Sequence, residues 1–426
     1  MLEKARRSIF WMADAIRHKP VRAHYEDILN LQEEYSDSQN EHLHRILGYA
    51  IQNVPFYKDI TEPDISRFPV MSKPVYKEQG NRCRSKEYLN DDKLFIASTS
   101  GSTGTPLVVY QDINKKARMR ADLIVAHEAV GWHLGDHYVF IRNWVSNYKQ
   151  SPIKNFAQNV ENISVTDFGD EKKAWLCKHL KKNFNSIIFG YASSVCDFLA
   201  YVRREKIEAH KLGVKLIVCD SDELTSTNRK ALEDTFACIV INRYDNEENG
   251  LLAISSPHKD ELTVNYPSIY IELLKLNSDE SVQPGEMGRV VVTDLFNYAM
   301  PLIRYDIGDL AISPDEPGKI RTLSCISGRK ADCVYSTDGK IISSVAISGI
   351  TEVFTSIEKY QFVQNSRTSF EFHYVGNIGE KDMQKLSDRL HTAIGANAEI
   401  RYIVEKDIPL GKNGKAKTTV CNIEIE

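Results

Sequence analysis

Residues 186–241 read SIIFGYASSVCDFLAYVRREKIEAHKLGVKLIVCDSDELTSTNRKALEDTFACIVI, a stretch in which short apolar runs alternate with helical patterns. The apolar runs are typical of buried strands and lie at Ser186–Phe189, Lys215–Cys219 and Cys238–Ile241. Between them, Val195–Glu205 and Thr225–Phe236 are predicted helices, the second with Thr225 as its N-cap. Strands that alternate with helices indicate an α/β fold around a sheet.

The same alternation extends toward the N-terminus, where Phe95–Ala97 and Val139–Ile141 predict strands and Lys172–Lys182 predicts a helix. After residue 262 the pattern changes, because the strands predicted at Val264–Leu274 and Gly288–Asp294 have little helix between them. We expect these later strands to form a β subdomain on the same core.

A second change of pattern near residue 328 predicts a separate C-terminal domain. Its predicted elements are strands at Ser369–Val375, Glu399–Glu405 and Thr418–Ile425, and a helix with Met383, Leu386, Leu390 and Ile394 on one face. About 100 residues of this α+β type form a typical compact module. We therefore expect a large α/β domain of residues 1–327 and a small α+β domain of residues 328–426, divided within Ser327–Asp332.

The composition is that of a globular protein of two to three domains. The chain has 426 residues, 42% apolar and 26% charged, with a formal net charge of −4. This balance gives no support to a nucleic-acid partner, which normally requires a basic domain. The eight cysteines include no C-x-x-C pair, so they indicate buried thiols in a reducing compartment.

The apolar runs also bear on membranes. The longest are far shorter than the ~20 residues of a membrane span, so we expect no span and a cytoplasmic location. The alternative of an amphipathic N-terminal helix that lies on a membrane surface is left by the basic residues that precede Ser8–Ile16.

The strongest local motif follows the predicted strand at Phe95–Ala97 and reads Ser98-Thr99-Ser100-Gly101-Ser102-Thr103-Gly104-Thr105-Pro106. Its glycines let the backbone turn tightly, and its hydroxyls and backbone amides can cradle phosphate oxygens. The spacing is not that of a Walker A loop. The alternative is a hairpin or a flexible surface loop.

Two acidic motifs follow later strands. In Arg304-Tyr305-Asp306-Ile307-Gly308-Asp309, a carboxylate beyond the strand could accept from ribose hydroxyls; the alternative is a strand-end turn with an internal ion pair. Tyr244-Asp245-Asn246-Glu247-Glu248-Asn249-Gly250 holds three carboxylates, the hard oxygen ligands that Mg²⁺ shares with substrate phosphates. The alternative there is a solvated acidic turn.

The fourth motif is the loop Pro409-Leu410-Gly411-Lys412-Asn413-Gly414-Lys415. A lysine on a glycine loop can deliver a point charge to a developing anion. The alternative is an ordinary basic hairpin loop.

Together, in this order and spacing, the four motifs resemble the adenylate-forming superfamily of acyl-CoA synthetases, non-ribosomal peptide adenylation domains and luciferases. The resemblance implies that Lys415 is the catalytic lysine, with Lys412 as the fallback, and that the hinge of a mobile C-terminal domain begins at Gly328-Arg329. It also implies that Glu248 and Arg329 are catalytic, with Glu248 as the Mg²⁺-associated residue. Asp309 is implied as the ribose acceptor, with Arg329 nearby. The implied nucleotide-binding residues are Ser98, Thr99, Ser100, Gly101, Ser102, Thr103, Gly104, Glu223, Tyr244 and Asp309.

Within the superfamily, two early phrases are similar to the phenylacetate–CoA ligase branch: Val54-Pro55-Phe56-Tyr57 and Phe68-Pro69-Val70-Met71-Ser72-Lys73. The segment Tyr244–Ala253 looks most like the capsular-polysaccharide-biosynthesis relatives of that branch. The departures from the superfamily pattern are Leu107, Asp222, Asp245 and Ala331.

The resemblance implies an ATP-dependent, AMP-forming ligase that uses Mg²⁺, and a homodimer. A carboxylic acid attacks the α-phosphate of ATP, and the acyl-adenylate then passes its acyl group to a thiol of CoA or of a carrier protein. The alternative acceptor is an amine or a hydroxyl in surface-polysaccharide or secondary-metabolite synthesis. A non-enzymatic adenylate-binding protein is a third hypothesis, which the departures motivate. The acyl pocket is expected near Phe189–Ser193, Asn242–Asn246 and Trp144.

Overall fold

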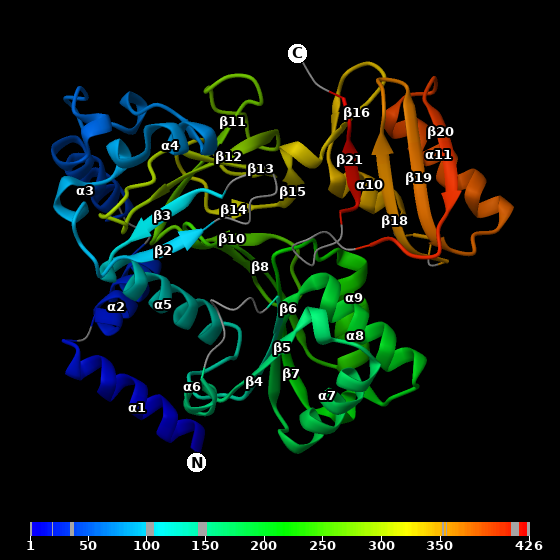
Figure 1. Cartoon of the computed structure of the whole chain (residues 1–426), viewed down its shortest axis with the longest axis horizontal. Helices are drawn as coiled ribbons and strands as arrows, with labels where there is room; N and C mark the ends of the chain where they lie inside the picture. Colours follow the sequence, from blue (N-terminus) through cyan, green and yellow to red (C-terminus); the bar gives the residue numbers. More distant parts are fainter. Residues whose placement is uncertain are drawn as a thin grey trace.

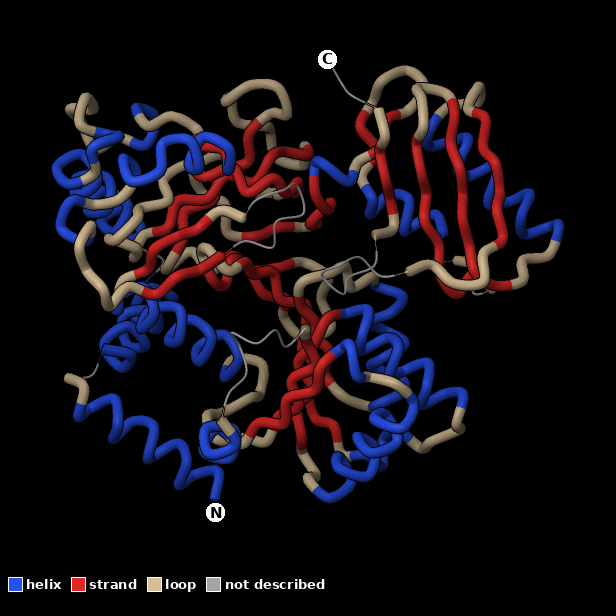
Figure 2. The backbone as a smooth tube through the Cα atoms, viewed as in Figure 1, coloured by secondary structure: helices blue, strands red, loops and turns tan. Residues whose placement is uncertain are grey.

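The computed structural model describes residues 2–18, 20–34, 38–98, 106–143, 151–351, 353–354, 356–409 and 417–423. Its strands form two large sheets in the N-terminal part and a separate sheet at one side of the molecule in the C-terminal part (Figures 1 and 2). The fold class expected from the sequence, a large α/β part with a β subdomain and a small α+β part, is confirmed.

An eight-stranded sheet carries the alternating pattern, in the order β14-β10-β9-β8-β7-β6-β4-β5. Strands β4 to β8 pair in parallel, whereas β9, β10 and β14 are antiparallel additions. The bounds are β4 Tyr138–Arg142, β5 Val160–Ser164, β6 Ser186–Tyr191, β7 Val214–Asp220, β8 Ile239–Asn246, β9 Gly250–Ser255, β10 Leu262–Val264 and β14 Thr322–Leu323.

Both faces of this sheet are covered, which is why its central strands are apolar runs without alternation. Ile188 and Ile217 pack into one core with α7 Asp170–Lys182, α8 Ala192–Arg204 and α9 Ser226–Phe236. Their neighbours Ile187 and Leu216 pack into a second core on the other face. Thr225 caps α9, because its hydroxyl accepts from the Asn228 backbone N–H at 3.1 Å.

A five-stranded sheet, in the order β1-β13-β12-β11 with β15 also on β13, lies beside the first. The helices of this part are α3 Ser38–Asn53, α4 Lys73–Gln79 and α5 Ile113–Glu128. Its strands are β1 Met71–Ser72, β11 Ile269–Leu274, β12 Met287–Asp294, β13 Tyr305–Ile312 and β15 Cys325–Arg329, with a separate hairpin of β2 Phe95–Ser98 and β3 Val108–Gln111. The β subdomain expected after residue 262 is thus present as strands of both sheets.

The C-terminal part has its own sheet, in the order β20-β19-β18-β21, and its own core around Phe362, Phe372 and Leu386. Its elements are β16 Val334–Tyr335, β17 Ile341–Ile342, α10 Ser344–Thr351, β18 Ile357–Gln364, β19 Ser369–Gly376, α11 Glu380–Ile394, β20 Glu399–Val404 and β21 Thr419–Cys421. Strand β15 crosses residue 327, so the division of the chain at residues 327 and 328 stays a prediction.

Helices α1 Leu2–Ile16, α2 Pro20–Glu34 and α6 Pro152–Gln158 lie at the opposite end of the molecule from the C-terminal sheet (Figure 1). Among the described residues, no helix has the length and apolar character to cross a bilayer.

Two sequence-based strand predictions differ from the structure. The strand predicted at Val264–Leu274 is two strands, because Ser268 donates its backbone N–H to the Asn265 carbonyl and turns the chain between them. Within the described residues, the strand predicted at Thr418–Ile425 ends at Cys421.

Candidate active site

The site is assembled where β8, β13 and β15 meet, and its centre is a chain of three side chains. The hydroxyl of Tyr244, at the end of β8, donates to Asp309 Oδ2 on β13 at 2.6 Å. Arg329 lies directly opposite Asp309 in the β13–β15 register, with its Nε 3.7 Å from Asp309 Oδ1. Three residues that the sequence predicted for the nucleotide site are therefore in contact, although 85 positions separate Tyr244 from Arg329 (329 − 244 = 85).

The protonation state of Tyr244 suits this role. Burial and the neighbouring Asp309 carboxylate raise the pKa of the Tyr244 phenol well above its ordinary value. The phenol therefore stays protonated at neutral pH and donates to Asp309 Oδ2. The remaining lone pairs of the Asp309 carboxylate can accept from ligand hydroxyls.

Glu248 lies in the turn between β8 and β9, on the same side of the site. Its carboxylate is buried and its Oε1 accepts from the Tyr305 hydroxyl at 3.3 Å. Burial raises the pKa of Glu248, and the positive charge of Lys73 opposes that rise. Burial lowers the pKa of Lys73, which also feels the charges of Glu248 and Arg329, so Lys73 belongs to the same electrostatic environment.

The backbone of the Glu248 turn is held from the strand and helix that follow the phosphate-loop motif. Gln111, at the end of β3, is fully buried and donates from Nε2 to the Glu248 carbonyl at 2.8 Å. Lys115, in α5, donates from Nζ to the Asn249 carbonyl at 2.7 Å and forms a buried ion pair with Asp294 at 2.6 Å. These bonds fix where the Glu248 carboxylate stands relative to the end of β3.

The residues present fit Mg²⁺ that is held by one protein carboxylate together with substrate phosphates and water. In the part of the chain that the structure describes, no group of three or more His, Cys, Asp or Glu side chains could hold a metal. Mg²⁺ is commonly held by one or two carboxylates plus substrate phosphates, with water completing the shell. The buried carboxylate of Glu248, with the Tyr305 hydroxyl beside it, suits that arrangement.

Glu223 connects the site to the C-terminal part. It follows β7, and its Oε2 accepts from the Ser348 hydroxyl of α10 at 3.0 Å. Ser348 also lies 2.7 Å from the Tyr360 hydroxyl. The adjacent departure Asp222 has a local partner, because its carboxylate accepts from the Ser193 backbone N–H at 3.3 Å.

The departure at Asp245 also has a structural reason. Arg243 is buried and pairs with Asp245 Oδ2 at 3.1 Å and with Asp220 on the neighbouring strand. The guanidinium lies 6.0 Å from the Phe189 ring, so the two segments predicted to line an acyl pocket are neighbours.

Most of the remaining predicted residues lie outside the part of the chain that the structure describes. Ser98 ends β2, while Thr99, Ser100, Gly101, Ser102, Thr103, Gly104, Trp144, Lys412 and Lys415 lie outside the described residues. Arg304, in the predicted ribose motif, has a structural role, because it pairs with Glu272 at 2.9 Å and donates to the Phe68 carbonyl.

Sequence reasoning missed five residues of this region: Lys73, Gln111, Lys115, Arg243 and Tyr305. Tyr305 and Arg243 stand next to or inside motifs that were recognised, and Lys73 ends the phrase Phe68–Lys73. Gln111 and Lys115 have no local signal, since their contacts with the Glu248 turn join positions 137 and 134 residues apart.

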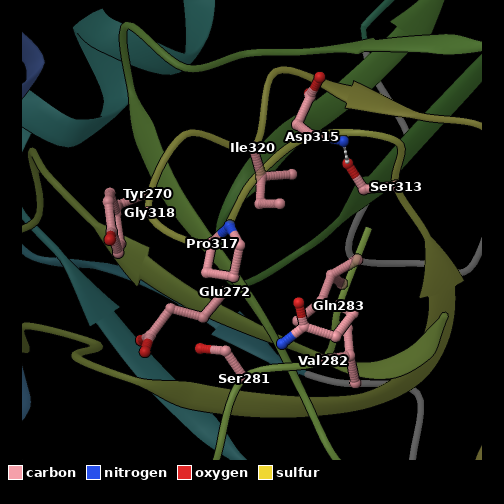
Figure 3. A pocket seen from close by; sticks show the side chains of 11 residues that line it. Tyr270, Glu272, Ser281, Val282, Gln283, Ser313, Asp315, Pro317, Gly318 and Ile320 are labelled. Atoms are coloured by element: carbon pink, nitrogen blue, oxygen red, sulfur yellow. Dashed lines mark hydrogen bonds between the residues drawn. The ribbon is translucent and has the colours of Figure 1, made fainter. Parts of the chain in front are cut away.

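A small, partly open cavity lies apart from this site (Figure 3). It has a volume of about 50 Å³, and Tyr270, Glu272, Ser313 and Pro317 are among the residues that line it. That volume has room for a few water molecules. The cavity is therefore a feature of the β11–β13 region and too small for a nucleotide.

Comparison with known proteins connects this geometry to a family. The profile of the CapK C-terminal domain matches residues 334–422. Protein CapK of Staphylococcus aureus is 25% identical over 440 residues, which cover 96% of this chain and 94% of CapK. Phenylacetate-coenzyme A ligase of Pseudomonas putida is 24% identical over 423 residues, covering 91% of this chain and 88% of the ligase. The chain is therefore similar to CapK and to phenylacetate-coenzyme A ligase over nearly its whole length.

Solved structures agree on the fold. The structure of 2-hydroxyisobutyryl-CoA ligase in the postadenylation state with R3-HIB-AMP has a TM-score of 0.71 at 16% identity, covering 92% of this chain and 90% of that ligase. ATP-bound MatB from Rhodopseudomonas palustris has a TM-score of 0.56 at 14% identity, covering 76% and 66%. The chain therefore has the fold of the adenylate-forming ligases, as the resemblance in its sequence implied.

Proposed function

We propose that this chain is an ATP-dependent, AMP-forming ligase that activates a carboxylic acid as an acyl-adenylate and transfers the acyl group to a thiol. The observation that carries the proposal is the contact of Tyr244, Asp309 and Arg329 beside the buried Glu248. The relatives named phenylacetate-coenzyme A ligase favour CoA as the thiol.

The roles of the residues follow from charge. Both reactants are anions, so the site must supply cations and hydrogen-bond donors where negative charge develops. Asp309 would accept from the ribose hydroxyls, with Tyr244 holding the orientation of its carboxylate. Residues Ser98 to Gly104 would hold the β- and γ-phosphates, and Lys415 would bridge the attacking carboxylate and the nucleotide.

The cation belongs to the same proposal. Glu248 would hold Mg²⁺, which supplies charge neutralisation at the phosphate oxygens. Burial disfavours the charge of Glu248, so a divalent cation beside it would lower its pKa toward the ordinary range. A cytoplasmic location and a homodimer complete what we propose from the resemblance.

A second candidate function is favoured by the similarity to CapK, which extends through the C-terminal domain. In that version the adenylation chemistry is unchanged, but the acyl group passes to an amine or a hydroxyl rather than to a thiol. The two versions differ only in the acceptor, so a single preparation of the protein can distinguish them.

The test is acid-dependent exchange of pyrophosphate into ATP across a panel of aromatic acids, sugar acids, amino acids and small aliphatic acids. Exchange without CoA is expected for at least one acid, and AMP release on adding CoA would favour the thiol. Amide formation with an added amine in the absence of thiol would favour the second candidate. Silence across the panel, with ATP binding intact, would assign the chain to non-enzymatic adenylate binding.

Lys415→Ala provides the internal control. The variant is expected to lose adenylation and to keep ATP binding, because the lysine acts on the attacking carboxylate rather than on the nucleotide alone. Wild-type exchange by Lys415→Ala would move the role to Lys412, which Lys412→Ala then tests.

A further inference from the structure

Helix α1 packs on the rest of the chain through a face that mixes charged and aromatic side chains. Asp14 is buried and accepts from the backbone N–H groups of Val21 and Arg22, at the start of α2, at 3.0 Å each. Arg7 pairs with Glu128 of α5 at 3.1 Å. Surface helices normally direct charged residues to water and apolar residues to the core. Asp14 is the buried polar residue of this packed face, so the question is which side chains of α1 face outward.

The outward face of α1 is apolar. Leu2, Ile9, Met12 and Ile16 are between 64% and 79% exposed. Positions 2, 9 and 16 repeat every seven residues and position 12 lies three after position 9, so at about 100° per residue these side chains share one stripe. The stripe runs the length of the helix.

The helix is held in this orientation from within. Its Phe10 and Trp11 rings contact each other, and Trp11 packs edge-on against Tyr25 of α2 with ring centroids 5.5 Å apart. Rotating the stripe inward would expose these aromatic rings and remove Asp14 from the end of α2. The stripe is therefore an outward surface of the folded chain.

Helix α6 extends the stripe. Its Ile153 and Phe156, three residues apart, are 82% and 74% exposed. The Arg6 guanidinium lies 5.3 Å from the Phe156 ring, and α6 stands beside the N-terminal end of α1 in Figure 1. We call the six side chains of both helices the apolar face: Leu2, Ile9, Met12, Ile16, Ile153 and Phe156.

The charge around the apolar face is positive, whereas the whole chain carries a net charge of −4. Lys4 of α1, Arg17 directly after it and Lys154 of α6 are exposed, and Arg6 of α1 contacts the Phe156 ring. Glu3 is an exposed acid of α1, and Asp14 is turned inward. We propose that α1 and α6 dock this protein on an anionic lipid surface, with the apolar face in the boundary of the acyl chains and the basic side chains at the headgroups.

Charge favours a bilayer over a second copy of the chain. A two-fold pairing through this face would bring the basic side chains of two copies into one interface, where like charges repel. An apolar stripe with basic margins is what interfacial helices present to anionic lipids. The C-terminal sheet lies at the far side of the molecule from α1, so docking leaves it uncovered (Figure 1).

The test is co-sedimentation of the full chain with vesicles. Vesicles of phosphatidylcholine mixed with phosphatidylglycerol are expected to bind the protein, and added salt is expected to weaken that binding. Vesicles of phosphatidylcholine alone are expected to bind it about tenfold or more weakly, since each basic side chain near an anionic surface contributes to the affinity.

Two surface variants and a matched control distinguish binding through the apolar face from non-specific binding by any exposed apolar side chain. Ile9→Gln and Phe156→Gln are each expected to weaken binding about tenfold, because a side chain that leaves the acyl boundary loses its apolar burial. Phe184→Gln is the control, since Phe184 is 67% exposed at a site outside the apolar face. Circular dichroism and urea unfolding check that all three variants fold.

Three results would overturn the proposal. The first is no binding to either vesicle, and the second is equal binding to both. The third is a dimer in sedimentation velocity that Ile9→Gln converts to a monomer while vesicle binding is absent, which would assign the apolar face to a second copy of the chain. None of these outcomes depends on the ligase activity.

Discussion

Two arginine–aspartate pairs lie close to β8, and they differ in burial rather than in composition. Asp220 and Arg243 oppose each other across β7 and β8, and Asp309 and Arg329 do so across β13 and β15. The side chains of the first pair are 6% and 9% exposed, against 19% and 48% for the second. Arg243 belongs to the first pair, and its neighbour Tyr244 donates to Asp309 of the second.

Burial distinguishes an ion pair that stabilises the fold from an ion pair that is accessible to a ligand. Burial opposes the charge of Arg243, but the carboxylates of Asp245 and Asp220 outweigh it and raise the pKa of the guanidinium. The pair is committed to the interior of the sheet. Arg329 is half exposed and stands 3.7 Å from its partner, so it can rearrange around a ligand. We therefore expect the first pair to govern stability and the second to govern nucleotide binding.

The largest expected effect is that of Arg243→Ala on stability. Removing Arg243 leaves the buried Asp220 and the partly buried Asp245 without their cation, which costs about 3–5 kcal/mol. Urea unfolding monitored by circular dichroism measures the loss. The matched control, Arg329→Ala, removes a half-exposed partner and is expected to cost about 0–1 kcal/mol. Equal losses in the two variants would contradict the division between the pairs.

The next effect is that of Asp309→Ala on ATP. The variant loses the acceptor proposed for the ribose, and hydrogen bonds to a charged group contribute about 1.5–3 kcal/mol, so KM for ATP should rise about 10- to 150-fold. Pyrophosphate exchange at varied ATP concentration measures the change. Asp306→Ala, on the same strand but paired with Arg289, is the control and should leave KM for ATP unchanged. A similar rise in both variants would mean that β13 as a whole had been disturbed.

A smaller effect is expected from Tyr244→Phe, which removes only the hydroxyl that donates to Asp309. One hydrogen bond contributes about 1 kcal/mol, so ATP affinity should fall about fivefold. Isothermal titration with ATP measures it. If Tyr244 acts by orienting Asp309, the double variant with Asp309→Ala will lose no more affinity than Asp309→Ala alone. Additive losses would give Tyr244 a nucleotide contact of its own.

The comparison also explains what could be predicted from the sequence. The α/β alternation was legible because β6 and β7 are apolar on both faces, and the fold class followed from it. Tyr244, Glu248, Asp309 and Arg329 were recognised because each belongs to a local motif. The pair of Arg243 was not predicted, because Asp245 was visible only as a departure from the superfamily pattern, and its partner Asp220 comes from a neighbouring strand.

Long-range contacts account for the other omissions. Gln111 holds the Glu248 turn across 137 positions, and Glu223 meets Ser348 across 125. No periodicity or spacing joins such positions, since the contacts exist only after the sheets and the C-terminal part have assembled. The outward stripe of α1 was partly visible as an amphipathic pattern, but which face points inward depends on Asp14 and on the neighbouring helix α2.

The smallest expected effect is a pH dependence of stability that comes from Glu248, the buried carboxylate of the proposed active site. Burial raises the pKa of this carboxyl above 4.5, so the native state favours its protonated form. Its stabilising contribution is fully present below the unfolded pKa and is lost as pH rises through the folded pKa. Glu248→Gln keeps the shape without the charge, so its stability relative to the wild type should increase as pH rises from 4 to 7 in the absence of Mg²⁺. Urea unfolding at several pH values measures the difference.

Adding Mg²⁺ and ATP should make the wild type more stable than Glu248→Gln at pH 7, because the wild type alone can hold the cation with a carboxylate. A difference that does not change with pH would mean that Glu248 is solvated and lies outside the buried site.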